Sequence, residues 1–164
     1  MLSRATLKTP IGTLYLLAHD EMLLASGFSS FAKLQAQLEN IDQERRTTTV
    51  KRIPIVSDLL NDYFDGDLKA LDGISVRQPG ERFSQSAWKA MRKISPGKTI
   101  SYADLANKSG SPDAIRAAGS ACARNLIALV VPCHRIVKSG GALGNYAYGL
   151  GVKEWLLRHE GALK

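Results

Sequence analysis

The chain has 164 residues, a formal net charge of +7 and 45% hydrophobic residues. This length suits one domain or two small ones, and this composition excludes an intrinsically disordered chain. The longest apolar run, residues 126–131, is far too short to span a bilayer. The N-terminus lacks the basic-then-apolar pattern of a secretion signal, so we expect a cytoplasmic protein with no membrane partner.

The cysteine content excludes a disulfide framework and argues against a zinc site. The chain has only Cys122 and Cys133, and it has three histidines and no CxxC spacing. Structural zinc usually needs four cysteine or histidine ligands at short, regular spacings. We therefore expect no metal, and one or both thiols free as packing groups or as a nucleophile.

Positive charge is concentrated in the second half of the chain. Residues 1–80 carry 9 basic and 10 acidic side chains, whereas residues 81–164 carry 13 basic and 5 acidic ones. A basic half of this kind is expected where a protein meets a polyanion such as DNA. A solvated basic surface that keeps the protein in solution explains the same charge equally well.

The first half of the chain alternates like a small sheet with helices. The predicted elements are strands at 3–8, 13–19 and 22–28, a helix at 31–38, a loop at 42–52, a helix at 54–64 and a strand at 74–77. No reactive cluster is assembled among them. We interpret this half as scaffold.

The second half is predicted to be mostly helical after a boundary at residues 78–80. Helical patterns cover residues 84–93, 101–108 and 112–123, and the last two are joined by a turn that contains glycine. The predicted fold class is α+β. A small N-terminal sheet-plus-helix domain, residues 1–78, packs on a mostly helical C-terminal domain, residues 79–164, that contains a helix-turn-helix.

The predicted helix at 112–123 has an unusual surface. Its predicted core face comprises Ile115, Ala118, Gly119 and Cys122, and its outward side comprises Asp113, Ala117, Ser120, Ala121 and Arg124, with Arg116 on the flank. Helices that read the major groove carry long polar side chains, but this outward side is mostly small. Small residues suit a narrow groove, and they are also typical of close helix packing.

Cys133 is the candidate nucleophile of the chain. It follows the apolar run 126–131 and is followed directly by His134 and Arg135. A thiolate is a strong nucleophile, and an adjacent histidine can serve as its base. A buried structural thiol is the alternative for an isolated cysteine after an apolar run.

These segments together resemble the O6-alkylguanine-DNA alkyltransferases, or methylated-DNA–protein-cysteine methyltransferases. The resemblance is carried by "SYADLA" at 101–106, "AIRAAGSACARN" at 114–125, "PCHRIV" at 132–137 and "GNYAYGLGVKEWLLRHE" at 144–160. The four blocks are in register over the second half of the chain. The first half is similar to the family's N-terminal domain only in size and strand–helix pattern.

The resemblance implies direct-reversal DNA repair by a single-turnover methyltransferase. The alkyl group would pass irreversibly from O6-alkylguanine to Cys133, so that each molecule acts once. His134 would be the base, acting through a water, and Glu160 would orient its imidazole. Asn125 would form a polar hinge between the recognition helix and the active-site segment.

The resemblance also implies a DNA partner that is double-stranded and bound through its minor groove, by a protein that is monomeric and can bind DNA cooperatively. Arg116 would fill the space left by the flipped base, Tyr102 would turn the phosphate and bind the guanine, and Tyr146 would wall the pocket. Main-chain groups at Ile136 and Ala147 would read the guanine edge. The implied DNA contacts of the helix are Arg116, Ala117, Ser120, Ala121 and Arg124.

Two departures from the family pattern concern the pocket. Leu126-Ile127-Ala128 stands where many relatives carry prolines, and Tyr148 stands where glycine is common. Two other functions fit parts of the same sequence. A DNA-binding module or regulator would need no transfer to Cys133, and a cysteine hydrolase would use Cys133, His134 and Glu160 in repeated turnover.

Overall fold

The computed structural model describes residues 1–164, and its contacts divide the chain into two compact units. Unit 1 comprises Met1–Pro79 and Leu126–Val130, and unit 2 comprises Gly80–Asn125 and Val131–Lys164. The α+β class predicted from the sequence is confirmed. The sequence predicted one domain boundary, after residue 78, and it did not predict that residues 126–130 belong by their contacts to unit 1. None of the helices is both long enough and apolar enough to cross a membrane.

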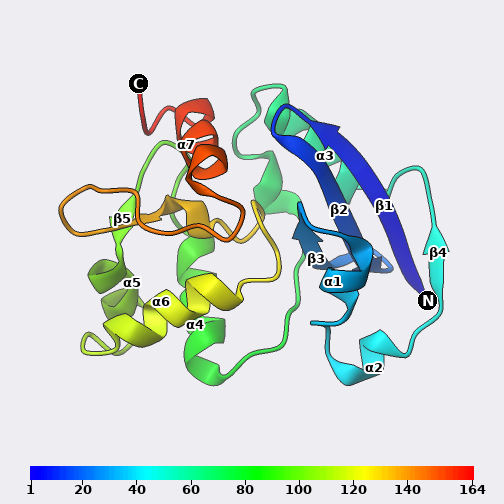
Figure 1. Ribbon diagram of the computed structural model, residues 1–164, viewed down its shortest axis with the longest axis horizontal. Helices are drawn as coiled ribbons and strands as arrows, with labels where there is room; N and C mark the ends of the chain where they lie inside the picture. The colour runs from blue at the N-terminus through cyan, green and yellow to red at the C-terminus, as the bar shows by residue number, and fades with distance from the viewer. The chain divides into compact units, whose positions relative to one another are not determined.

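Unit 1 is built on a four-stranded sheet in the order β3-β2-β1-β4 (Figure 1). Strands β1 (Leu2–Thr9), β2 (Gly12–His19) and β3 (Met22–Gly27) form an antiparallel meander, as their alternating patterns predict. β4 (Thr47–Thr49) pairs in parallel with β1. The expectation of a loop at 42–52 is therefore wrong, because a three-residue strand is too short to show a periodic pattern.

The 3-10 helix η1 (Ala70–Gly73) and three short α-helices complete unit 1. The α-helices are α1 (Phe31–Gln35), α2 (Asn40–Gln43) and α3 (Val56–Phe64). α1 begins at the N-cap Ser30, and its Phe31 ring meets Tyr15 of β2 edge to face at a centroid distance of 5.0 Å. The predicted strand at 74–77 is reduced to a single bridge between Leu23 and Val76.

Residues Leu126–Val130 lie against β3 within unit 1. The Ser26 hydroxyl donates to the Ala128 carbonyl at 2.7 Å, and the Ser26 main chain bonds Leu126 and Ala128 at 3.0 and 2.9 Å. Leu129 has a φ of 72°, which a branched side chain rarely adopts. All five residues are buried, so the apolar run of the sequence is a core segment.

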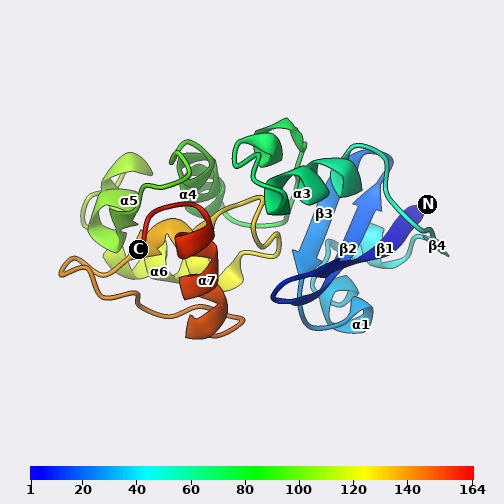
Figure 2. The ribbon, with the colours of Figure 1, turned by 90° about the horizontal axis from the view of Figure 1, so that it is seen from above.

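Unit 2 is a cluster of helices (Figure 2), and it also contains one small parallel sheet of two strands. Its helices are α4 (Arg82–Arg92), α5 (Tyr102–Lys108), α6 (Ile115–Arg124) and α7 (Leu150–His159), and its strands are β5 (Ile100–Ser101) and β6 (Ile136–Val137). α5 starts with a capping box in which Ser101 and Asp104 bond each other's main chain. The predicted helix-turn-helix corresponds to α5 and α6, although α6 begins three residues after Pro112.

Trp88 is central to the packing of unit 2. It is 4% exposed, and its indole Nε1 donates to the Ala121 carbonyl of α6 at 2.9 Å. A β-carbon added at Gly80 would lie 2.5 Å from the Trp88 ring. Glycine is therefore required at this position because the indole occupies the space that a side chain would need.

We predict that Gly80→Ala lowers the free energy of unfolding by about 1–3 kcal/mol, the usual cost of overpacking a core. Gly151→Ala is the matched control, because nothing lies within 4 Å of a β-carbon added there. Urea unfolding of both variants measures the difference. Equal stability of Gly80→Ala and the unmodified chain would contradict the prediction.

Candidate active site

A cavity of about 600 Å³ in unit 2 brings together residues from α5, α6, the Cys133 turn and the loop before α7. Its lining comprises Tyr102, Arg116, Gly119, Ser120, Cys122, Ala123, Cys133, Asn145, Tyr146 and Ala147. Six residues predicted for the site from the sequence are among them: Tyr102, Arg116, Ser120, Cys133, Tyr146 and Ala147. Cys122 also lines the cavity, although the sequence assigned it to the helix core.

Cys133 begins a short 3-10 helix, Cys133–Arg135, at the end of the buried segment. Pro132 precedes it, and the Cys133 N–H donates to the Val131 carbonyl at 2.8 Å. The thiol is half-buried and faces the cavity, whereas His134 and Arg135 are buried behind it. A single turn of the chain therefore places the Cys133 thiol at the cavity and the next two side chains in the protein interior.

Glu160 is a buried carboxylate held by two side chains. Its Oε2 lies 2.8 Å from His134 Nε2, and Arg135 donates from Nε to Oε1 at 2.8 Å and from Nη2 to Oε2 at 3.0 Å. Arg135 Nη1 also donates to the Ile94 carbonyl at 2.7 Å. Both oxygens of this buried carboxylate therefore accept hydrogen bonds from neighbouring side chains.

The charge state of this cluster fixes the histidine tautomer. Burial alone would raise the pKa of the Glu160 carboxyl, but hydrogen bonds from His134 and Arg135 hold it well below its ordinary value. Burial also lowers the pKa of His134, so its imidazole is neutral. An ionised carboxylate only accepts hydrogen bonds, so His134 Nε2 carries the proton. His134 Nδ1 is buried without a protein partner and offers a lone pair.

The Cys133 thiol is under opposing influences. Burial raises its pKa, while the Asn125 amide and the charge of Lys153 act to lower it. Asn125 caps the end of α6 and donates from Nδ2 to the Val131 carbonyl at 2.8 Å. This bond joins the end of α6 to the segment that leads into Cys133, the place where the sequence predicted a polar hinge.

Lys153 is a buried residue near the site that the sequence analysis did not identify. It is 0% exposed, and its Nζ donates to the carbonyls of Ile136 at 2.6 Å and Asn145 at 3.4 Å. Burial lowers its pKa, and the two cysteines raise it. The available signal was a lysine on the same face of α7 as the buried Leu156 and Leu157, where an apolar residue is expected.

The orientation of α6 corrects two expectations. Ala121 is fully buried and its carbonyl accepts the Trp88 bond, so its side chain does not lie on the outward, DNA-facing side. Ile115, predicted to be in the core, is 47% exposed. Ala118 and Ala121 form the core face, because the helix turns them toward Trp88 of α4.

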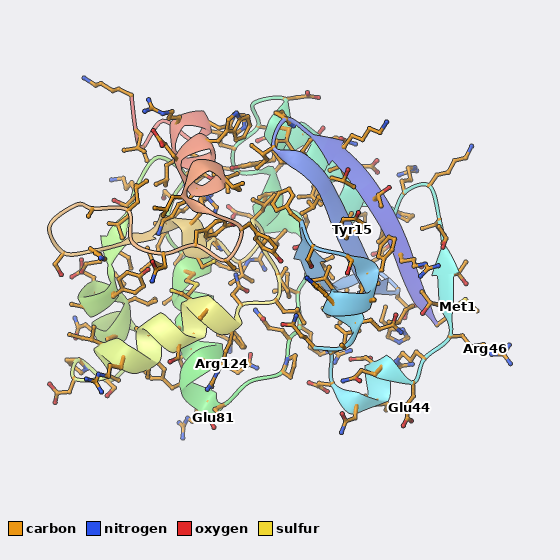
Figure 3. The ribbon with its side chains drawn as sticks, in the orientation of Figure 1. Met1, Tyr15, Glu44, Arg46, Glu81 and Arg124 are labelled. Atoms are coloured by element: carbon orange, nitrogen blue, oxygen red, sulfur yellow. The ribbon has the colours of Figure 1, made fainter.

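The other predicted residues of α6 lie as expected on its accessible side. Arg116, Ser120 and Arg124 are exposed and Ala117 is half-buried. Arg124 stands at the C-terminal end of the helix (Figure 3). Ile136, by contrast, is buried and outside the cavity lining, and its main chain bonds Cys133 and Lys153.

Gly144 lets the loop before α7 approach Tyr102. Its φ is 76°, and a β-carbon there would lie 3.0 Å from the Tyr102 hydroxyl oxygen. Tyr146 and Tyr148 of the same loop meet edge to face at 6.0 Å between ring centroids. The aromatic at 148 therefore packs on Tyr146, a residue of the cavity wall.

Comparisons with known proteins find relatives along nearly the whole chain. The sequence model described as "6-O-methylguanine DNA methyltransferase, DNA binding domain" matches residues 82–162. Methylated-DNA–protein-cysteine methyltransferases of Shigella flexneri and Methanosarcina acetivorans are 37% and 39% identical. The first alignment covers 94% of this chain and 93% of the relative, and the second covers 96% and 97%.

The structure is also similar to solved structures. The crystal structure of Mycobacterium tuberculosis OGT in complex with DNA superposes with a TM-score of 0.83 at 33% identity, covering 98% of this chain and 93% of that one. The crystal structure of M. tuberculosis O6-methylguanine methyltransferase gives 0.78 at 32% identity, with 99% and 94% covered. On full-length sequence identity and fold, the chain belongs to the methylated-DNA–protein-cysteine methyltransferase family.

Proposed function

We propose that the chain repairs O6-alkylguanine in double-stranded DNA by moving the alkyl group to Cys133. As a member of its family it is an O6-methylguanine-DNA methyltransferase and binds DNA. The observation that carries the assignment of the acceptor is the position of Cys133. Its thiol faces the cavity, and the adjacent residue is a neutral histidine held by a buried carboxylate.

The reaction is a displacement at carbon. The thiol proton leaves through a water to His134 Nδ1, the thiolate sulfur attacks the alkyl carbon, an S–C bond forms and the C–O6 bond breaks. The departing guanine takes up a proton, in net terms the one that the thiol released, and becomes an ordinary base. Glu160 keeps His134 Nδ1 unprotonated before the reaction and stabilises the imidazolium that forms.

The substrate base must leave the duplex to reach this thiol. α6 presents Arg116 and Ser120 at the mouth of the cavity, and its small side chains let the helix approach a minor groove closely. Arg116 would occupy the place of the flipped base, and Tyr102 would contact the guanine from the cavity wall. Tyr146 and Ala147 would complete the pocket, and Asn125 would hold the hinge between α6 and the Cys133 segment.

The thioether product has no evident exit, because the site offers no group that regenerates a thiol from it. The proposal is therefore one transfer per molecule, without a cofactor or metal. No three metal-binding side chains of the His, Cys, Asp or Glu type lie together in the structure. We also propose that the protein is a monomer, that it acts in the cytoplasm on the DNA of the nucleoid, and that it can bind DNA cooperatively.

Cys133→Ala should abolish methyl transfer and leave duplex binding intact. Mass spectrometry after incubation with a methylated duplex should show one added methyl group on the unmodified chain, on Cys133, and none on the variant. Cys122→Ala is the matched control, because it removes the other thiol of the cavity and should keep transfer. Binding without any added methyl would favour a non-catalytic module, and sustained turnover of an activated ester would favour a hydrolase.

Arg116→Ala should slow repair in duplex DNA by roughly 10–100-fold at saturating DNA, because unstacking a base costs a few kcal/mol. Reaction with free O6-methylguanine, which needs no flipping, should change little. Arg124→Ala serves as control, since it lies at the other end of α6 and should weaken binding without slowing the bound complex. Equal losses on duplex and free base would refute the flipping role.

Lys153→Gln should move the pH profile of methyl transfer to higher pH. Removing the positive charge raises the pKa of Cys133, so less thiolate is present at neutral pH and the loss is recovered as pH rises. Single-turnover rates across pH measure this, with the exposed Lys138→Gln as control. A loss of the same size at every pH would mean that Lys153 acts only through packing.

A further inference from the structure

Unit 2 has a second cavity, of about 630 Å³, that the proposed reaction does not use. Four lysines line it: Lys89, Lys93, Lys98 and Lys108. Its lining includes hydroxyl side chains and no acidic residue. We call this cavity the lysine groove, defined by these four residues.

The lysines of the groove are not engaged by the protein itself. All four are exposed, and none belongs to an ion pair of the structure. Lys89, Lys93 and Lys108 lie at the C-terminal ends of α4 and α5, where cations offset the helix dipole. Two helix ends supply about one negative charge in total, so four positive charges leave a clear excess.

The groove lies away from the DNA-facing helix. Trp88 points from α4 toward α6, where it bonds Ala121. At about 100° per residue, Lys89 and Lys93 project from α4 about 100° and 140° away from Trp88. α5 carries Tyr102 of the active-site cavity at one end and Lys108 at the other, and the two cavities share no lining residue.

We propose that the lysine groove binds the phosphate backbone of a second DNA segment, so that one molecule bridges two duplexes. The proposal rests on the proposed function in one respect, that the first duplex lies on α6. Lysines are mobile point charges that bind phosphate without reading bases, and hydroxyls such as those of Ser95 and Thr99 are common phosphate donors.

DNA fits these features better than an acidic peptide does. The charged groups of the groove are exposed ends of long side chains, so they offer no fixed frame for the backbone of a peptide. A duplex presents one charge per about 1.7 Å of axis, and each neutralised phosphate releases counterions. DNA is also the polyanion that this protein binds. The second contact would keep the protein near DNA while the first site searches.

The test compares two variants with the same change in charge. The groove variant carries Lys→Gln at positions 89, 93, 98 and 108, and the control carries Lys→Gln at positions 8, 33, 51 and 69, which are exposed lysines of unit 1. Energy transfer between donor-labelled and acceptor-labelled short duplexes reports bridging. Sedimentation gives the number of duplexes and protein molecules in the complex, and repair of a single methylated duplex is measured separately.

The unmodified chain and the control should bring two duplexes together with one protein molecule. In the groove variant, bridging should fall by at least about tenfold. The slope of the logarithm of the binding constant against the logarithm of salt concentration should become less steep by up to about 3.6, because each lost phosphate contact accounts for about 0.9. Its repair of a single duplex should be unchanged. Intact repair without bridging by the unmodified chain would overturn the inference alone, whereas absent repair would overturn the proposed function.

Three further outcomes would also overturn the inference. Equal loss in both variants would mean that general charge, and not the groove, attracts the second duplex. Complexes of two proteins with two duplexes would mean that protein pairing makes the bridge. Displacement of the second duplex by polyglutamate at lower charge concentration than by competing duplex would identify the groove as a site for acidic proteins.

Discussion

The buried contact between Glu160, His134 and Arg135 is the interaction on which the site depends. An unpaired carboxylate in this position would cost several kcal/mol, and Arg135 and His134 offset that cost by donating hydrogen bonds to both oxygens. Through Arg135 the same contact reaches the Ile94 carbonyl beyond the end of α4. One carboxylate therefore ties the Cys133 turn to two helix ends and also sets which nitrogen of His134 can accept a proton.

The proposed reaction requires a thiol that is shielded from bulk water and can still ionise. Shielding comes from the buried segment around Cys133 and raises the pKa of the thiol. Lys153 and Asn125 oppose this effect, and Lys153 does so as a buried lysine, which itself is unfavourable for folding. The site thus gives up some stability to place a positive charge where it favours the thiolate.

The sequence revealed what lies in contiguous blocks and missed what depends on three-dimensional packing. Cys133 and His134 are adjacent, and the strands of the meander alternate clearly, so both were predicted. The two-residue strands β5 and β6 are too short for any periodic signal. α6 consists largely of alanine and other small residues, so its core face has little hydrophobic contrast, and Trp88 decides that Ala121 is buried while Ile115 is exposed.

The apolar run before Cys133 also has a physical explanation that the sequence alone could not supply. Residues 126–130 belong by their contacts to unit 1, while Asn125 and Val131 on either side belong to unit 2. Ser26 holds residues 126–130 through main-chain and hydroxyl hydrogen bonds. The Asn125 side-chain amide donates to the Val131 carbonyl and so joins the two ends of this segment. Leu129 keeps a positive φ within it, which costs of order 1–3 kcal/mol and persists only where the surroundings enforce it. Asn125 and Val131 both belong to unit 2, so their bond fixes the chain two residues before Cys133 and thereby helps to position the thiol.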